Sequence, residues 1–411
     1  MNSPDEVALW ATSGAMAITG LRDGTPLVST GRPATAVAQA LRQIADRTEA
    51  RTGVRPELPG VTLLGERAAL TGFGRNGPRS IGGPFRILRT ADGHLGISLP
   101  RASDRESVPA LIGAAVPGEP WDSLAAWAYA TPTAEAVGRC RVLDLAASAI
   151  LKPEGSRDAA PVPVRITPGA ARARVPERPR VVDLSSLWAG PLCAHLLWLG
   201  GAEVIKVEST RRPDGARGGN KEFYDLLHHG HAAVAFDFHA PADVDRLRAL
   251  IASADLVIEA SRPRALQRLG IRAEDHVAAG VGWLSITARG RASDTVGFGD
   301  DVACDAGLLA WAGEQPVPAA DALADPLTGV TAAAVATEAL LSTTSALVEV
   351  SMMDTAAAAA AHPPDDHRVV GHAGSWLVET ATGLHPVLAP VSRRGPGPAA
   401  AAGADNHRYA P

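Results

Sequence analysis

Cysteine and aromatic residues are scarce in this sequence of 411 residues. The three cysteines, Cys140, Cys193 and Cys304, lie far apart, so neither a disulfide framework nor a thiolate metal site is expected. Aromatic residues make up only 4% of the chain and mark no pocket for a particular substrate. Positive charge is not in excess, because 39 lysines and arginines face 44 aspartates and glutamates. A mildly acidic chain without a basic stripe is not expected to bind nucleic acid.

Long apolar runs are also missing. No segment approaches the ~20 apolar residues that span a bilayer, and the opening MNSPDEVALWATSG lacks a basic stretch followed by an apolar one. We therefore expect no membrane segment and no secretory leader, and we predict a cytoplasmic protein. The GxGxxG fingerprint of dinucleotide sites is absent after the first strong strand. With 46% hydrophobic and 20% charged residues, the chain can bury the cores of two or three domains.

One stretch, residues 178–208, shows a complete strand–helix–strand pattern. Its apolar residues predict a buried strand at 181–184, then a helix that ends at a glycine pair, and a second strand at 203–207. The turn after the first strand carries Trp188 and Ala189. In an open α/β sheet such a turn lies at the carboxyl edge of the strands, where ligands bind.

The same alternation of strands and helices continues to residue 354. Apolar runs at 232–238 and 255–260 and the segment GWLSITA predict further strands, and amphipathic patterns such as 242–252 lie between them. This order is typical of a parallel sheet. We predict an α/β fold in which residues 180–354 form a Rossmann-like parallel sheet domain with helices on both faces.

The segments on either side predict simpler units. Residues 1–151 predict a second, mostly helical domain with a glycine-rich loop and a β-hairpin in FRILRTADGHLGISL. Residues 152–179 are rich in proline, alanine and arginine and predict an interdomain linker, although the arginines could also form an anion patch. Residues 355–411 predict a partly ordered tail, with a hairpin in SWLVETATGLHPVL and a loose end after Arg393.

The segment ALADPLTG is the sharpest chemical feature. Asp325 and Pro326 precede a long helical pattern, which is typical of an N-cap whose carboxylate accepts backbone N–H groups. A carboxylate at a helix N-terminus stays ionised, so Asp325 could also act as a nucleophile in acyl transfer. The local sequence leaves both roles open, and they do not exclude each other.

Histidines and arginines form two further clusters. In LLHHGHAAVAFDF, His228, His229 and His231 surround Gly230. Adjacent histidines usually diverge, so surface or ligand-phosphate contacts are expected there rather than a metal site. Arg262 follows a predicted strand directly, and phosphate binding or a solvated helix face would both explain it.

Six motifs in order carry a resemblance to a known family. They are VVDLSSLWAGPLCAHLLWLGGAEVIKVE, GHAAVAFDF, ADLVIEASRPRALQRLGI, WLSITARG, GFGDDVACDAGLLAW and LADPLTG. Together they resemble the family III CoA-transferases of the formyl-CoA and carnitine-CoA type, over residues 180–354. The segment SIGGPFRILRTADGHLGISL resembles, less strongly, the glycine loop and hairpin from the middle and C-terminal part of that family. The parts would then stand in a rearranged or truncated tandem order.

The resemblance implies a function and a set of site residues. Asp325 would attack an acyl-CoA thioester, and CoA would pass to a free carboxylic acid through an aspartyl-CoA thioester. Coenzyme A and acyl-CoA would be substrates, no cofactor would be bound permanently, and the protein would be a homodimer, possibly interlocked. Gly82 and Gly83 would belong to the loop that shields the anhydride from water. The implied CoA contacts are Trp188, Ala189, Arg211, His228, His229, Gly230, His231, Arg262, Arg268 and Asp300.

Two alternatives accompany the transferase interpretation. The related α-methylacyl-CoA racemases place a histidine where this chain has Asp300, and a carboxylate cannot supply that imidazole. The family usually shows Asn-Arg-Gly-Lys-Arg where this chain has His-His-Gly-His-Ala at residues 228–232. That change removes fixed positive charge from the expected CoA site, so a catalytically silent CoA-binding homologue is the other alternative.

Overall fold

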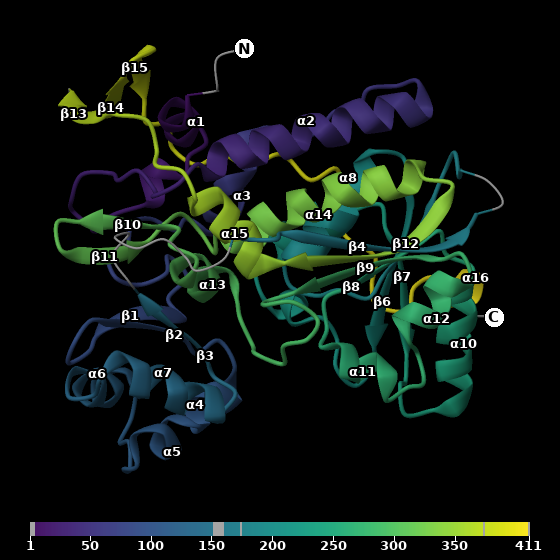
Figure 1. Cartoon of the computed structure of the whole chain (residues 1–411), viewed down its shortest axis with the longest axis horizontal. Helices are drawn as coiled ribbons and strands as arrows, with labels where there is room; N and C mark the ends of the chain where they lie inside the picture. Colours follow the sequence, from purple (N-terminus) through teal and green to yellow (C-terminus); the bar gives the residue numbers. More distant parts are fainter. Residues whose placement is uncertain (1–4, 151–159, 173–174, 373–374, 410–411) are drawn as a thin grey trace.

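A seven-stranded sheet forms the centre of the computed structural model, which describes residues 5–150, 160–172, 175–372 and 375–409 (Figure 1). The strand order is β4-β12-β9-β8-β5-β6-β7, and every neighbouring pair is parallel except β4 with β12. The predicted parallel α/β sheet is therefore confirmed. The strands are β4 (Val164–Ala171), β5 (Arg180–Asp183), β6 (Glu203–Ser209), β7 (Ala232–Phe236), β8 (Leu256–Glu259), β9 (Gly282–Thr287) and β12 (Thr344–Ser351).

Helices cover both faces of this sheet (Figure 1). Val181 and Leu256 point into a core shared with α8 and α14, whereas the next residues, Val182 and Val257, point into a core shared with α10 and α12. This alternation follows from the two-residue period of a strand. The helices around the sheet are α8 (Ala189–Leu199), α9 (Lys221–His228), α10 (Pro241–Ala252), α11 (Pro263–Gln267), α12 (Ala273–Ala278), α13 (Gly299–Asp305) and α14 (Ala324–Leu341), with the 3-10 turn η3 (Gly215–Gly218).

The first helices of the chain pack on the sheet domain. Helix α2 (Pro33–Thr52) lies across α14, and its residues Val37, Leu41 and Ile44 belong to the same core as α8 and α14 (Figure 1). The shared core means that residues 5–76, expected in a separate helical domain, are part of the packing around the sheet. The other elements here are α1 (Glu6–Thr12), η1 (Met16–Ile18), η2 (Val61–Leu64) and α3 (Glu66–Thr71).

A smaller unit with a core of its own follows. Its sheet is antiparallel in the order β1-β2-β3, and the predicted hairpin is present, with Phe85 of β1 opposite Ser98 of β2. The pattern at 133–151 suggests one helix, but α7 ends at Val142 and residues 146–150 form β3. Asp144 has a φ of 59°, which breaks the helix, and pairing with β2 outweighs the helix preference of the alanines. The elements are β1 (Phe85–Arg89), β2 (His94–Ser98), α4 (Ala102–Glu106), α5 (Val108–Ile112), α6 (Trp121–Tyr129), α7 (Thr133–Val142) and β3 (Ala146–Ile150).

Part of the expected linker is a strand. Residues 164–171 form β4, which pairs antiparallel with β12 at the edge of the large sheet. Most of its side chains are exposed, and Pro168 and Gly169 interrupt it. An edge strand of this kind has no apolar alternation, which is why its sequence looks like a linker. Residues 151–159 and 173–174 of the expected linker lie outside the described residues.

The C-terminal tail is more ordered than expected. The predicted hairpin is present as β14 and β15, joined by β13. Beyond Arg393, the side chain of Asn406 bonds to both the N–H and the C=O of Ala235, at 2.9 Å each, and so covers the free edge of β7. The expectation of a loose end is therefore wrong, because polar pairing with an edge strand leaves no apolar pattern. The tail elements are α15 (Met352–Ala360), β13 (Arg368–His372), β14 (Ser375–Thr380), β15 (Gly383–Pro386) and α16 (Asn406–Tyr409).

A short hairpin follows α13. The sequence pattern at 301–311 predicts one helix, but α13 ends at Asp305, and the residues after Gly307 form β10 (Leu309–Ala312), which pairs with β11 (Gln315–Pro318). Within the ranges that the structure describes, no helix combines the length and the apolar character needed to cross a membrane.

Candidate functional site

Asp325 lies where three backbone segments meet. It is the second residue of α14, and its carboxylate accepts hydrogen bonds from the backbone N–H groups of Ala189, at the start of α8, and Gly299, at the start of α13. The N-cap interpretation of Asp325 is wrong, since the N-cap of α14 is Leu323 and makes no side-chain capping bond. The carboxylate instead binds donors from other segments, which local sequence cannot reveal.

The charge of Asp325 is set by its neighbours. Burial raises the pKa of this carboxyl group to about 6, with Asp321 adding to the rise, while Arg67 and the two backbone N–H groups oppose it. Burial and Asp321 raise the pKa of Asp300 to about 8. At neutral pH, Asp325 is therefore mostly ionised and Asp300 mostly protonated. Asp325 is half-buried, and an ionised carboxylate that is partly withdrawn from water yet still accessible is chemically suited to act as a nucleophile.

The loop before α14 is held in an unusual conformation. Ala320 and Ala322 have φ values of 54° and 45°, in the left-handed region that residues other than glycine rarely adopt. The N–H of Ala320 donates to Thr19 Oγ1 at 2.8 Å, and the N–H of Ala322 donates to Asp300 Oδ1 at 3.0 Å. Between them, Asp321 is buried and binds Arg67 through both carboxylate oxygens. Backbone strain of this kind persists only where surrounding contacts hold it, and such places often serve function.

Gly299 allows the close approach of this loop to α13. A Cβ atom at residue 299 would clash with the carbonyl oxygen of Ala322 and with Asp325 Oδ2, nearer than real Cβ atoms come to other atoms. Only glycine therefore lets the N–H of residue 299 reach the Asp325 carboxylate.

If the CoA transfer that the resemblance implies takes place at Asp325, replacing Gly299 by alanine is expected to lower its rate about 100-fold, because displacement of one preorganised donor costs this much in comparable sites. Steady-state kinetics would measure the loss. Gly138→Ala is the matched control: Gly138 is exposed on α7 and a Cβ there meets nothing within 4 Å. This control should keep its activity and gain up to about 1 kcal/mol in stability. Unchanged kinetics in Gly299→Ala would show that the close approach is unimportant.

The turn after β5 supplies Trp188 and Ala189, as predicted. Leu187 has a φ of 72°, and its N–H donates to Asp214 Oδ1 at 3.1 Å. The Trp188 ring is 4% exposed, with the Arg67 guanidinium 4.4 Å from its centre on one side and Phe223 edge-on at 5.0 Å. The buried Trp188 side chain thus anchors the turn in the interior, while Ala189 lies next to Asp325.

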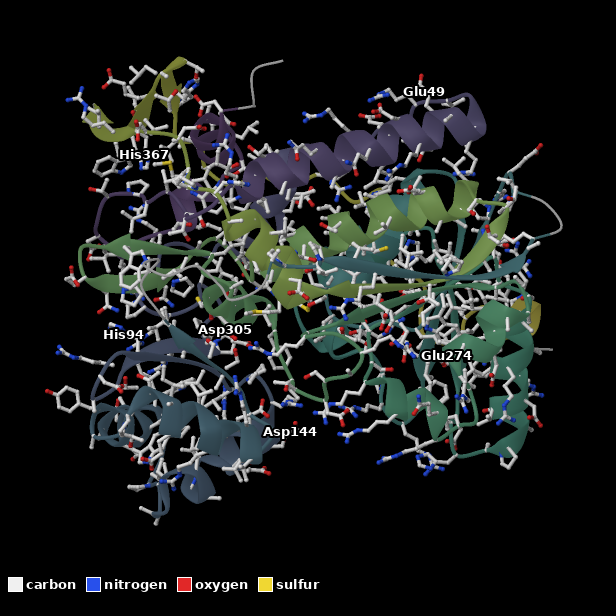
Figure 2. The ribbon with its side chains drawn as sticks, viewed as in Figure 1. Glu49, His94, Asp144, Glu274, Asp305 and His367 are labelled. Atoms are coloured by element: carbon white, nitrogen blue, oxygen red, sulfur yellow. The ribbon has the colours of Figure 1, made fainter. Side chains whose placement is uncertain are left out.

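Two of the three predicted arginines, Arg211 and Arg262, lie at the carboxyl edge of the sheet and are paired. Arg211 follows β6 and binds Asp237 at 2.8 Å. Arg262 follows β8 and binds Asp144 at 2.6 Å, and Asp144 lies on the side of the smaller unit that faces the sheet domain (Figure 2). Arg268 is exposed beyond α11. Arg262 therefore ties the two units together.

Gly82 and Gly83 form the turn before β1. Gly83 has a φ of 92° and no atom within 4 Å of a Cβ placed on it, whereas a Cβ on Gly82 would meet the Phe73 ring at 3.3 Å. The Ser80 hydroxyl accepts the N–H groups of Gly83 and Phe85, both at 3.1 Å. This turn thus has the backbone freedom that the predicted glycine loop requires.

The histidines predicted to contact CoA are enclosed instead. His228 and His231 are 3% and 5% exposed and lie with His195 between α8 and α9, and their rings are centred 5.9 to 6.3 Å apart where they meet. Gly230, with a φ of 75°, packs against the Trp198 ring. His229 is half-buried at the edge of this group. Across the described residues, no set of three or more His, Cys, Asp or Glu side chains is placed to hold a metal ion.

The buried histidines predict that the folded protein loses stability in acid. Burial lowers the pKa of His228 to about 3 in the folded protein, against about 6.5 in an unfolded chain. The stability that neutral His228 contributes is complete above pH 6.5 and is lost as the pH falls toward 3. In urea unfolding, the free energy of unfolding of His228→Phe relative to that of the wild type should increase by about 2 kcal/mol when the pH is lowered from 7.5 to 5.

The comparison between variants is needed because other groups act in the opposite direction. Burial raises the pKa of Glu6 and Asp301 to about 7 each, so these groups take up protons in the folded state and favour it in acid. His407→Phe, at an exposed position, controls for the removal of an imidazole. A His228→Phe profile parallel to the wild type would contradict the prediction.

Two surface hollows lie at the opposite edge of the sheet from Asp325. The larger, about 470 Å³, is lined by residues at the start of β6 and β7 and by the tail, and the smaller, about 310 Å³, adjoins it. Both open at the amino ends of the strands, whereas Ala189 and Asp325 lie beyond the carboxyl end of β5. We assign neither hollow to the chemistry of Asp325.

Three residues of the site were missed in the sequence. Arg67 and Asp321 form the ion pair beside Asp325, and Gly299 donates to it. Arg67 precedes Asp321 by 254 positions, and a lone arginine in a helix carries no local signal. Gly299 directly precedes the predicted Asp300, but a single glycine before a helix does not reveal what it approaches.

Comparison with known proteins adds family information. A stretch of 103 residues is 32% identical to the formyl-CoA:oxalate CoA-transferase of Afipia carboxidovorans and covers 23% of this chain and 24% of that protein. Over 140 residues the chain is 31% identical to the succinyl-CoA–D-citramalate CoA-transferase of Chloroflexus aurantiacus, which covers 30% of this chain and 35% of the relative. The chain thus spans only about a quarter to a third of the length of these relatives.

Solved structures give weaker matches. A hypothetical protein from Mycobacterium tuberculosis aligns with a TM-score of 0.44 and 26% identity, over 49% of this chain and 64% of that one. A CAIB/BAIF family protein from Brucella suis aligns with a TM-score of 0.44 and 20% identity, over the same shares. At the level of the family, residues 178–386 match the CoA-transferase family III. This match covers half of the sequence and includes Asp325, so the chain belongs to the CoA-transferase family III.

Proposed function

We propose that this protein moves CoA between an acyl-CoA and a free carboxylic acid, with Asp325 as the nucleophile. The observation that carries the proposal is the position of the Asp325 carboxylate, beside Ala189 and Gly299 and beyond the carboxyl end of β5. Ligands of parallel α/β sheets bind at this edge. No metal or bound cofactor is needed for the steps that follow.

The proposed cycle balances in four steps. An Asp325 oxygen attacks the thioester carbonyl carbon, the C–S bond breaks, and a mixed anhydride and the CoA thiolate form. The thiolate then attacks the Asp325 carbonyl carbon of the anhydride, which releases the donor acid as a carboxylate and leaves an aspartyl-CoA thioester. The acceptor carboxylate attacks this thioester to form a second anhydride, and the thiolate finally attacks its acyl carbon to give the new acyl-CoA and free Asp325.

The two backbone N–H groups would serve the second and third steps. When the thiolate attacks the Asp325 carbonyl carbon, negative charge develops on the carbonyl oxygen of Asp325, whose carboxyl group these N–H groups adjoin. Donors fixed in advance at such an oxygen stabilise the tetrahedral intermediate without reorganisation.

Binding roles are proposed from the position of some residues and from the resemblance for others. Ala189 and Asp300, beside Asp325, would face the reacting part of CoA, and the resemblance suggests that Gly82 and Gly83 cover the anhydride. Arg211 and Arg262 lie at strand ends, where a CoA phosphate could exchange with their present aspartate partners, and the exposed Arg268 could also bind a phosphate. The enclosed His228 and His231 are not proposed to touch CoA, since His231 lines the larger hollow at the opposite edge of the sheet from Asp325.

The substrates are proposed from the relatives. Their names specify formyl-CoA with oxalate and succinyl-CoA with D-citramalate, which suggests small acids as donor and acceptor. We also propose a homodimer in the cytoplasm, and light scattering would test the dimer. Formyl-CoA with oxalate and succinyl-CoA with citramalate are the first pairs to assay.

A trapping experiment tests the proposal. The protein is incubated with the donor acyl-CoA and then with hydroxylamine, which converts an aspartyl thioester or anhydride into a hydroxamate. Peptide mass spectrometry should find the hydroxamate on Asp325, only when acyl-CoA was present. CoA binding without this adduct would favour the silent homologue, and exchange of the substrate α-proton with deuterated water, without an acceptor acid, would favour the racemase.

A further inference from the structure

Arg67 reaches the Asp325 site from outside the family-matched region. It lies on α3 (Glu66–Thr71), whereas the family match spans residues 178–386. Its Nε donates to Asp321 Oδ2 at 2.7 Å and its Nη2 to Asp321 Oδ1, so the pair is bidentate. The guanidinium carbon also lies over the Trp188 ring, 4.4 Å from its centre. One side chain thus joins the two segments that flank Asp325.

The position of α3 is itself fixed. Glu66, next to Arg67, is buried and binds Arg393 of the tail through both carboxylate oxygens. Leu63 and Leu64, just before α3, are buried in the core shared with α8 and α14. Arg67 therefore enters the site from a rigid element, as preorganised charge requires.

Arg67 matters because it is a cation among several carboxyl groups. Asp321 from the loop and Asp300 from α13 surround Asp325 with negative or ionisable groups, and Asp301 is the next residue on α13. Arg67 is the cation that acts on Asp300, Asp321 and Asp325 together. Without it, a carboxylate crowded by others would retain its proton.

We propose that Arg67 is a positioning residue that holds the negative charge of Asp325 and orders the Ala320–Ala322 loop against Trp188. The N-terminal segment would thereby complete a site whose nucleophile lies in the family-matched part of the chain. This inference rests on the proposed function for its relevance to catalysis, but the charge of Asp325 can be measured without any substrate.

The test is a titration of Asp325 in the whole protein by infrared difference spectroscopy, with Asp325→Asn identifying its carboxyl band. In Arg67→Met the midpoint of the Asp325 titration should rise by at least about one pH unit. In Asp321→Asn this midpoint should fall, because the repulsion between Asp321 and Asp325 is lost and Arg67 becomes available to Asp325. Arg67→Lys, which keeps the charge, should restore a midpoint close to that of the wild type.

The matched control is Arg32→Met. Arg32 also forms a bidentate ion pair, with Asp365, and its side chain is 19% exposed against 29% for Arg67. This variant should lose stability without moving the midpoint of the Asp325 titration. Equal midpoints in folded Arg67→Met and wild type, or equal shifts in Arg67→Met and Arg32→Met, would overturn the inference.

If Arg67→Met fails to fold, the titration of Asp325 in Asp321→Asn tests the inference instead. An Asp325 midpoint that does not fall in this variant would also overturn the inference. A further readout concerns catalysis: the acid limb of the kcat/KM profile should shift upward in Arg67→Met and return in Arg67→Lys. If the wild type transfers no CoA, the proposed function fails while the titration still decides the role of Arg67.

Discussion

Replacing Asp325 by asparagine is expected to reduce CoA transfer by at least about 10⁴-fold, the scale seen when an enzyme loses its nucleophile. Asparagine keeps the shape of the side chain and can still accept from the N–H groups of Ala189 and Gly299. It cannot form the anhydride, because an amide oxygen at neutral pH is a poor nucleophile. Initial rates with the active donor and acceptor pair would measure the loss.

Asp245→Asn is the control for this substitution. Asp245 lies exposed on α10, paired only with the neighbouring Arg248 at 2.8 Å, so its loss should leave the rates unchanged. Asp325→Asn should also still bind CoA in calorimetry, since the removed group acts in the chemical step. Transfer at wild-type rates in Asp325→Asn would exclude Asp325 as the nucleophile.

The pH dependence of the wild type bears on the same assignment. The pKa of Asp325, raised by burial to about 6, predicts that the rate of acylation falls as the pH drops through 6, because the protonated acid cannot attack. An ordinary aspartate would keep its activity to about pH 4. The two cases differ by about two pH units.

The sequence could predict the central unit because its signals are local. The strand–helix–strand pattern of residues 178–208 appears as β5, α8 and β6, since a buried parallel strand is a short apolar run and its helix ends at a glycine pair. The helix predicted after Asp325 is also present, as α14, but the role of Asp325 as the nucleophile stays a prediction. In both helices, the residues that form the feature are neighbours in the chain.

What could not be predicted depends on partners far away in the chain. Strands β3 and β4 exist because β2 and β12 offer them an edge, and neither has an apolar alternation of its own. The histidines of residues 228–231 looked like surface groups, since nothing in that segment shows that α8 would enclose them. Arg67 and Asp321 likewise meet only after residues 5–76 have packed on the sheet domain.

The buried charges beneath the site predict the second large effect. Lys206, on β6, is 1% exposed, and its Nζ lies 3.0 Å from Asp214 Oδ2 and 3.6 Å from Asp183 Oδ2. It also donates to the carbonyl oxygen of Ser185, in the turn that leads to Trp188. Lys206→Met is expected to lose about 3 to 5 kcal/mol of stability, because two buried carboxylates would remain without their cation.

The control for this prediction is Lys221→Met. Lys221 also pairs with an aspartate, but its side chain is 75% exposed, so water screens the pair and less than about 1 kcal/mol should be lost. Urea unfolding at pH 7.5 would compare the two. Equal losses in both variants would mean that burial does not decide the cost.

Lys206→Met should also disturb the turn that leads to Ala189. Asp214 accepts the N–H of Leu187 at 3.1 Å, and Lys206 in turn pairs with Asp214. Removing all three charges in Asp183→Asn/Lys206→Met/Asp214→Asn should restore most of the stability, since no buried charge is then left unpaired. The amide oxygen introduced by Asp214→Asn could still accept from the N–H of Leu187, so the turn and the Ala189 donor should recover with it. If stability returns without CoA transfer, the charge of the triad itself, and not only the fold of the turn, is required at Asp325.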